Sequence, residues 1–210
     1  MSEGKIPLIG IAGGVASGKS MISDALACLG AAVISADRLA HQVLTFDEVK
    51  QAIRQRWGEQ AFGSDGQVDR QAVAGIVFAP DTQGRRELEF LEQLTHPAVG
   101  RLAMAELERL NREKSCAAIV MDVPLLFESG WNRWCDKIVF VDAPREERLK
   151  RALARGWTEE DFSRREARQE SLETKKKLAD VVIDNSASRE HAQAQIEQAW
   201  PDLTGAPVAR

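Results

Sequence analysis

One stretch near the start of the chain constrains its fold more than any other feature. Residues Gly13 to Ser20 read G-G-V-A-S-G-K-S and match the phosphate-binding pattern G-x-x-x-x-G-K-[ST] at every fixed position. The apolar residues 6–12 predict a buried strand before it, and residues 21–29 carry apolar side chains at helical spacing, with Gly30 as a stop signal. This order of strand, loop and helix predicts an α/β nucleotide-binding fold.

The residue types in the loop suit a polyphosphate ligand. Glycines let backbone N–H groups approach phosphate oxygens and accept positive φ angles. Lys19 supplies a cation for the β- and γ-phosphates, and Ser20 supplies a hydroxyl ligand for Mg²⁺. The alternative is a glycine-rich turn with a solvated lysine. The residues expected to bind ATP here are Gly14, Val15, Ala16, Ser17, Gly18, Lys19, Ser20 and Met21.

Composition excludes several other classes of protein. The chain has 210 residues, of which 44% are hydrophobic and 29% are charged, and its net charge of -4 argues against a general nucleic-acid or anionic-membrane surface. No apolar run is long enough to span a bilayer, and the first strand follows the N-terminus without a leader. The three cysteines are widely spaced, which favours core thiols in a cytoplasmic protein.

Four more apolar runs, at 31–35, 116–122, 137–142 and 179–185, predict strands, and polar residues stand where they end. In open α/β sheets ligands collect outside the carboxyl ends of the strands. Asp37 could therefore take a proton from an attacking hydroxyl, or it could be a helix N-cap. Asp122 resembles a Walker B carboxylate that holds Mg²⁺, or it caps a turn. Asn185 could meet an adenine edge, or merely turn the chain.

The long connection from about residue 39 to 115 reads as an inserted helical lobe. Val49, Ile53 and Trp57 mark one of its helices, and a turn at 63–66 separates it from the next. Pro97 predicts a break, with a new helix over about 98–113. His96, just before this proline, is a turn residue or a substrate contact.

Arginines cluster on two predicted helices after the fourth strand. Arg148, Arg151 and Arg155 fall on one helix face, and Thr158 with Asp161 suggests a capping box that begins a second helix, which bears Arg164, Arg165 and Arg168. Phosphoryl transfer needs such cations around the γ-phosphate, so the hairpin could be a mobile lid. The alternative is a solvated helical pair joined by glutamate–arginine bridges.

Taken together, the motifs resemble the dephospho-coenzyme A kinase family over nearly the whole chain. The resemblance rests on the phosphate loop and on stretches 36–41, 66–70, 77–78, 95–97, 123–128, 151–155, 165–169 and 182–186. It implies a three-layer P-loop kinase fold with a five-stranded parallel sheet, ATP as donor with Mg²⁺, and the ribose 3′-hydroxyl of dephospho-coenzyme A as acceptor. It also implies that Asp37 is the base and that Lys19, Arg151, Arg155 and Arg165 neutralise the phosphates.

The same resemblance implies an acceptor side lined by Asp37, His41, His96, Leu125, Phe127 and Glu128. The expected organisation is a core of 5–38, 116–144 and 179–200, a helical acceptor lobe of 39–115 and a lid of 145–170. A monomer with no nucleic-acid or membrane partner is expected. The sequence departs from the family pattern at Ser35, Met21 and Gly100-Arg101. A P-loop kinase of another small metabolite or of a nucleoside monophosphate is the alternative.

Overall fold

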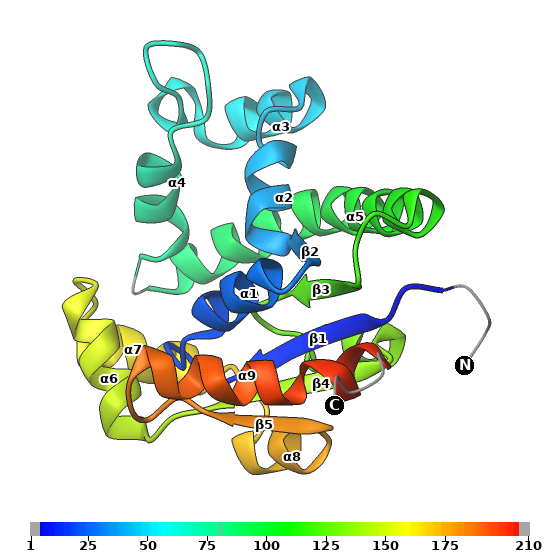
Figure 1. Ribbon diagram of the computed structural model, residues 1–210. Coiled ribbons are helices and arrows are strands. Elements are labelled where there is room, and N and C mark those ends of the chain that lie inside the picture. Colours follow the sequence, from blue (N-terminus) through cyan, green and yellow to red (C-terminus); the bar gives the residue numbers. More distant parts are fainter. Residues whose placement is uncertain (1–4, 80, 206–210) are drawn as a thin grey trace. The chain divides into compact units, whose positions relative to one another are not determined.

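The computed structural model describes residues 5–79 and 81–205, and five of its segments form one parallel sheet. The predicted five-stranded sheet is confirmed, with strand order β2-β3-β1-β4-β5 (Figure 1). Its central strand is buried along its whole length, as its uninterrupted apolar sequence predicts. The strands are β1 (Leu8–Gly13), β2 (Ala31–Ser35), β3 (Ala118–Asp122), β4 (Lys137–Asp142) and β5 (Val181–Asp184).

The strand order places the phosphate loop at a switch point of the sheet. β1 pairs with β3 on one side and with β4 on the other, so the connections leave in opposite directions around its carboxyl end. In doubly wound sheets this is where ligands bind. The register also aligns the strand ends, because Ser35 pairs with Asp122 and Asp142 pairs with Asp184.

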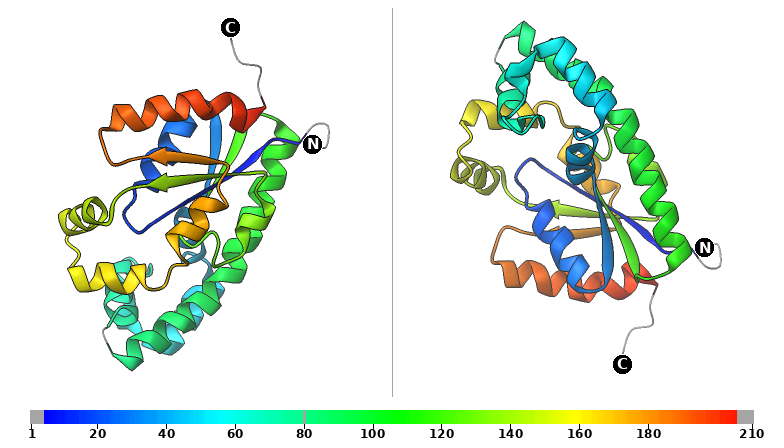
Figure 2. Two further views of the ribbon diagram at one scale, coloured as in Figure 1. Left: turned by 90° about the horizontal axis from the view of Figure 1, so that it is seen from below. Right: turned by 90° about the horizontal axis from the view of Figure 1, so that it is seen from above.

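Helices cover both faces of this sheet. On one face, α1 (Lys19–Cys28) and α9 (Arg189–Thr204) pack together, and Ile22, Leu26 and Ile196 enter the core between helices and strands. On the other face lie α8 (Leu172–Lys177) and the last turns of α5 (Thr82–Glu113), as Figure 2 shows. The part of the chain that contains the sheet has three further elements: α6 (Arg145–Ala154), α7 (Glu159–Glu166) and the 3₁₀ turn η2 (Trp131–Trp134).

The chain divides into two compact units. The first contains the residues up to Ser35 together with those from Leu107 onward, and the second is Ala36–Glu106. The second has its own apolar core, in which Val49, Ile53 and Trp57 pack with residues of the following helices. Its elements are α2 (Ala36–Val43), α3 (Asp47–Trp57), η1 (Glu59–Ala61), α4 (Arg70–Val77) and most of α5.

The predicted break at Pro97 is wrong, because α5 runs without interruption through that residue. A proline inside a helix removes one backbone hydrogen bond. Here Pro97 is exposed, so water can reach the carbonyl that loses its partner, whereas Thr95, Ala98 and Val99 are buried. Continuous packing of one helix face across the proline therefore outweighs the local breaking signal.

Two smaller expectations are also corrected. Arg168 lies beyond the end of α7 at Glu166 and is not part of that helix. The cysteines are free, but Cys28 is exposed and Cys116 and Cys135 are only half-buried, so they are not core thiols. Burial, followed by the nearby carboxylate of Asp136, raises the pKa of Cys135 to about 12.

Within the described residues, no helix has both the length and the apolar character needed to cross a membrane.

A buried carboxylate stabilises the second unit. Glu87 on α5 is 3% exposed and accepts hydrogen bonds from Trp57 Nε1 at 2.8 Å and from Arg56 Nε at 2.8 Å. The hydrogen bond from Arg56, followed by that from Trp57, lowers the pKa of Glu87, so the carboxylate is ionised at neutral pH. Glu87 thereby joins α3 to α5 through hydrogen bonds to Arg56 and Trp57.

We expect Glu87→Leu to lower the free energy of unfolding by about 1–3 kcal/mol, because the buried indole N–H of Trp57 loses its acceptor. Urea denaturation followed by tryptophan fluorescence measures this. Glu89→Leu is the matched control, since Glu89 is exposed on the same helix and its loss should change stability by no more than about 0.5 kcal/mol. Equal losses in the two variants would contradict the structural role of Glu87.

Candidate active site

The phosphate loop adopts a backbone conformation that requires glycine at two positions. Gly18, immediately before α1, has a φ of 101°, and a Cβ there would collide with the side-chain amide nitrogen of Asn185. Gly13 has a φ of 152°, and a Cβ would lie 2.7 Å from the carbonyl oxygen of Val141. Both positions therefore exclude larger side chains. The loop leads straight into α1, so the N-terminal N–H groups of this helix face the same space.

Asn185 and Arg151 both donate hydrogen bonds to the backbone of the phosphate loop. The carbonyl oxygen of Ser17 accepts hydrogen bonds from Asn185 Nδ2 at 2.7 Å and from a terminal nitrogen of Arg151 at 3.0 Å. The other terminal nitrogen of Arg151 donates to the backbone carbonyl of Asn185 at 2.7 Å. Sequence reasoning assigned both residues to nucleotide binding, and the structure brings both of them to the loop. A contact between Asn185 and an adenine edge stays a prediction.

Two further residues bind the backbone of Val15: Arg148, which the sequence placed only in the arginine hairpin, and Gln169, which had no predicted role. The Val15 N–H donates to Gln169 Oε1 at 3.1 Å, and its carbonyl accepts from Arg148 at 3.3 Å. Arg148 is 4% exposed and pairs with Glu166 at 2.7 Å. The three-residue spacing of Arg148 and Arg151 predicted that they share a helix face, and this spacing could have placed Arg148 at the loop as well. Gln169 carried a signal only as part of the family-like stretch 165–169.

Lys19 lies against the loop that it belongs to. Its ammonium donates to the carbonyl oxygens of Gly13 at 3.1 Å and Gly14 at 3.2 Å. Burial lowers the pKa of Lys19 to about 8, and the carboxylate of Asp122 opposes this shift. The ammonium is therefore protonated at pH 7, in a weakly solvated position where its charge acts strongly on a phosphate.

Ser20 and Asp122 supply oxygen atoms of the kind that Mg²⁺ prefers. Ser20 is exposed in the first turn of α1, and Asp122 ends β3, where Ser23 Oγ donates to its carboxylate at 3.1 Å. The described residues contain no group of three or more His, Cys, Asp or Glu side chains that could hold a metal ion. Mg²⁺ in nucleotide enzymes commonly takes one or two protein ligands together with substrate phosphates and waters. The hydroxyl and the carboxylate fit that pattern.

Asp37, His41 and His96 belong to the second compact unit. Asp37 is exposed in the first turn of α2, two residues beyond the end of β2. The N-cap alternative for Asp37 is therefore wrong, since the helix already begins at Ala36. His41 is exposed, and a terminal nitrogen of Arg70 approaches its Nδ1 at 2.9 Å and its Nε2 at 3.0 Å. His96 is exposed on α5.

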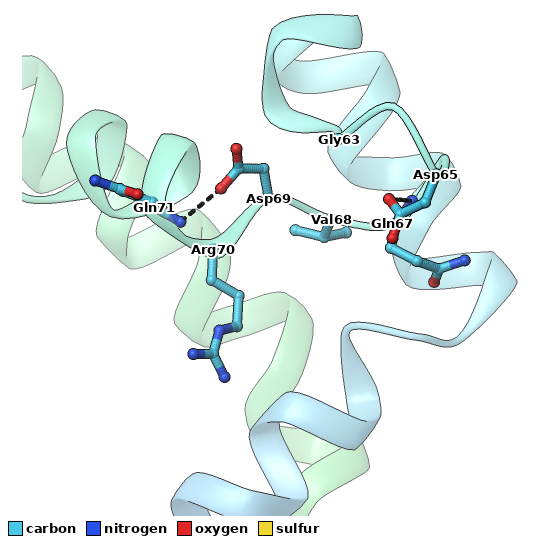
Figure 3. A pocket seen from close by; sticks show the side chains of 7 residues that line it. All are labelled: Gly63, Asp65, Gln67, Val68, Asp69, Arg70 and Gln71. Atoms are coloured by element: carbon cyan, nitrogen blue, oxygen red, sulfur yellow. Dashed lines mark hydrogen bonds between the residues drawn. The ribbon is translucent and has the colours of Figure 1, made fainter.

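Arg70 also borders a pocket of about 410 Å³ in this unit, at the turn before α4 (Figure 3). The two carboxylates of the pocket accept hydrogen bonds from nearby backbone N–H groups. Asp69 caps α4 by accepting from the Gln71 N–H at 2.9 Å, and Asp65 accepts from the Gln67 N–H at 3.0 Å. Arg70 is the cationic side chain of the lining. The lining residues are Gly63, Asp65, Gln67, Val68, Asp69, Arg70 and Gln71.

The segment after β3 is more deeply packed than a loop that only lines a cleft. Leu126 and Phe127 are buried, and Leu125 is half-buried. Glu128 pairs with Lys175 on α8 at 2.6 Å. Of the predicted acceptor contacts in this segment, Phe127 lies in the core and Glu128 lies in a buried ion pair.

The arginine hairpin makes the local contacts expected of charged helices, and its role as a lid stays a prediction. The capping box of Thr158 and Asp161 is confirmed at the start of α7. Arg164 pairs with Glu160 at 3.4 Å, as expected of solvated helices. Arg165 stacks over the ring of Trp157 at 4.3 Å, and burial lowers the pKa of its guanidinium. Arg155 is exposed at the end of α6.

Comparisons with known proteins point to one family. Residues 7–191 match the family model described as Dephospho-CoA kinase. A relative named Dephospho-CoA kinase from Symbiobacterium thermophilum is 42% identical over 202 residues, which is 94% of this chain and 82% of the relative. One of the same name from Carboxydothermus hydrogenoformans is 41% identical over 196 residues, or 91% of each chain.

Two solved structures share the fold of this chain. TT1252 from Thermus thermophilus is 34% identical and has a TM-score of 0.75, with 96% of this chain and 100% of that chain covered. Dephospho-CoA kinase from Campylobacter jejuni is 24% identical and has a TM-score of 0.66, with 94% and 97% covered. The second similarity is one of fold.

The pKa of Lys19 leads to a testable pH dependence. Because only the protonated ammonium attracts phosphate, and a bound phosphate raises the pKa, affinity for a nucleoside triphosphate should fall as pH rises through about 8. We expect a loss of about tenfold between pH 7 and pH 9, as one titrating group gives. Titration calorimetry with a non-hydrolysable triphosphate measures this. Lys19→Arg, which stays charged, should give a flatter profile, and parallel profiles would exclude Lys19 as the titrating group.

Proposed function

Because this chain belongs to the dephospho-CoA kinase family, we propose that it transfers the γ-phosphate of ATP to the ribose 3′-hydroxyl of dephospho-CoA, giving coenzyme A and ADP. The observation that carries the proposal is the phosphate loop, with its left-handed Gly18 and the N-terminus of α1, in a chain that the family model matches over residues 7–191.

The first compact unit supplies the ATP site in this proposal. The N–H groups of the loop and of the first turn of α1 bind the β- and γ-phosphates, and Lys19 adds its charge. Ser20 and Asp122 would hold Mg²⁺, which would supply positive charge to offset that of the phosphates when bound with ATP. Arg151, whose guanidinium already supports Ser17, lies where it can shift from the loop carbonyl to a phosphate.

Asp37 is the proposed base. As the 3′-hydroxyl oxygen forms its bond to the γ-phosphorus, its proton passes to the Asp37 carboxylate, and the bond from the γ-phosphorus to the bridging oxygen of ADP breaks. Asp37 is suited to this role because its carboxylate is exposed and follows directly after the end of β2. Arg155 and Arg165, on the hairpin of residues 145–170, neutralise the charge that redistributes during transfer, and the hairpin acts as the lid.

The second compact unit supplies the acceptor site. His41 and His96 are exposed imidazoles of this unit, and Arg70 lies within hydrogen-bonding distance of His41. We propose that these residues, with Leu125, Phe127 and Glu128 of the segment after β3, contact dephospho-CoA. A cationic guanidinium next to an imidazole suits the phosphates of this acceptor.

The substrate assignment is tested with a panel of acceptors. Purified protein with Mg²⁺ and ATP should release ADP far faster with dephospho-CoA than with nucleoside monophosphates, shikimate or pantetheine. A coupled assay for ADP, with product identified by mass spectrometry, measures this. ADP release that never exceeds the rate without acceptor would overturn the proposal, and a better acceptor in the panel would redirect it.

The base is tested with Asp37→Asn. This variant should lose about 10²- to 10⁴-fold in kcat, because the amide does not accept the proton, while its affinity for ATP stays nearly unchanged. Asp47→Asn is the matched control, since Asp47 is an exposed aspartate in the first turn of the next helix and should retain full activity. An Asp37→Asn enzyme with the turnover of the control would remove Asp37 from this role.

A further inference from the structure

A buried ion pair lies beside the phosphate loop, and one of its two members, Lys175, has no role in the proposal above. Lys175 on α8 and Glu128 after β3 approach to 2.6 Å, with side-chain exposures of 3% and 16%. Lysine is almost never buried without a partner, because removing its charge from water is costly. The neighbouring Lys176 and Lys177 are exposed, so burial singles out one of three consecutive lysines.

The two oxygens of Glu128 differ sharply in their contacts. Oε1 accepts from Lys175 Nζ and also from the backbone N–H of Glu170 at 2.7 Å. Oε2 is buried and has no hydrogen-bond partner among the residues that the structure describes. Buried carboxylate oxygens normally accept a hydrogen bond, so a buried oxygen without a partner indicates that a donor comes from outside the protein. A reactant bound at the site can supply that donor.

Electrostatics keeps this open oxygen negatively charged. Burial by itself opposes ionisation of Glu128, but the hydrogen bond from Lys175, together with backbone N–H groups, lowers the pKa of the carboxyl below its usual value. Loss of the ammonium would remove the largest of these favourable contacts. Lys175 therefore maintains both the orientation and the charge of Glu128.

The pair lies close to the phosphate loop. Glu128 and Lys175 are both near enough to Lys19 to influence its pKa, the first raising it and the second lowering it. Glu170, which donates to Glu128, follows Gln169, whose side chain accepts from the Val15 N–H of the loop. One short segment thus connects the ion pair to the phosphate loop through hydrogen bonds.

We propose that Lys175 is a positioning residue for phosphoryl transfer, which fixes Glu128 so that Oε2 accepts a hydrogen bond from an uncharged N–H or O–H group of the acceptor. The proposal rests on the proposed function, because it assigns Glu128 to the acceptor. ATP carries donors of the same chemistry, in its amino and hydroxyl groups. Kinetic constants measured separately for dephospho-CoA and for ATP show which substrate supplies the donor.

The decisive variant replaces the pair with apolar side chains of similar size, Lys175→Met/Glu128→Leu. Buried ion pairs replaced in this way often keep their stability, whereas loss of one partner leaves a buried charge. We expect a melting temperature near that of the parent, and kcat/KM for dephospho-CoA lowered about tenfold or more, the effect of one lost hydrogen bond to a charged group. KM for ATP should change less than about twofold on the same reasoning.

Controls separate positioning from simple packing. Lys177→Met removes an exposed lysine from the same helix and should leave all constants unchanged. Lys175→Met alone should lower both the melting temperature and kcat/KM for the acceptor, and Lys175→Arg, which restores the cation, should recover part of both losses.

Two results would overturn the proposal. One is a stable double variant with parental constants for both substrates, because the pair would then only connect two segments. The other is a loss confined to ATP, which would place the donor on the nucleotide. Should the double variant not fold, Glu128→Gln decides the question, since it keeps the side-chain volume and removes the charge; unchanged acceptor constants there would equally overturn the proposal. Activity of the parent enzyme on dephospho-CoA tests the proposed function separately.

Discussion

The carbonyl oxygen of Ser17 and its two side-chain donors support the rest of the candidate site. Asn185, from the end of β5, and Arg151, from α6, both donate to this one atom, and Arg151 also binds the backbone of Asn185. Gly18 must lack a side chain for the amide of Asn185 to fit beneath the loop. A network of this kind fixes the direction of the loop's N–H groups before any phosphate arrives, and such preorganisation lowers the cost of binding.

The cations of the site are arranged so that few of them point freely at solvent. Lys19 donates to loop carbonyls, and Arg148 is buried between the carbonyls of Val15 and Ala143 and the carboxylate of Glu166. Gln169 accepts a hydrogen bond from the Val15 N–H. Side chains thus pair with both backbone groups of Val15, whereas the buried hydroxyl of Ser17 has no hydrogen-bond partner among the described residues.

The two compact units carry different parts of the candidate site. The unit that contains the sheet carries the phosphate loop, Ser20, Asp122 and the arginines of the hairpin. The helical unit carries Asp37, His41 and Arg70, and it has its own apolar core. Asp37 follows Ser35, the last residue of β2, by two positions in the chain.

The sequence by itself determined the strands, the phosphate loop and the capping box of α7, because these depend on local spacing and on residues with special backbone preferences, such as Gly18 and the Thr158–Asp161 pair. It indicated Pro97 as a break, and it did not predict α8 or distinguish Lys175 from Lys176 and Lys177. Only the tertiary structure decided these points. Whether a proline interrupts a helix, and which charged side chain is buried, depends on which face meets the rest of the fold, and a charge-rich helix does not encode that in its spacing.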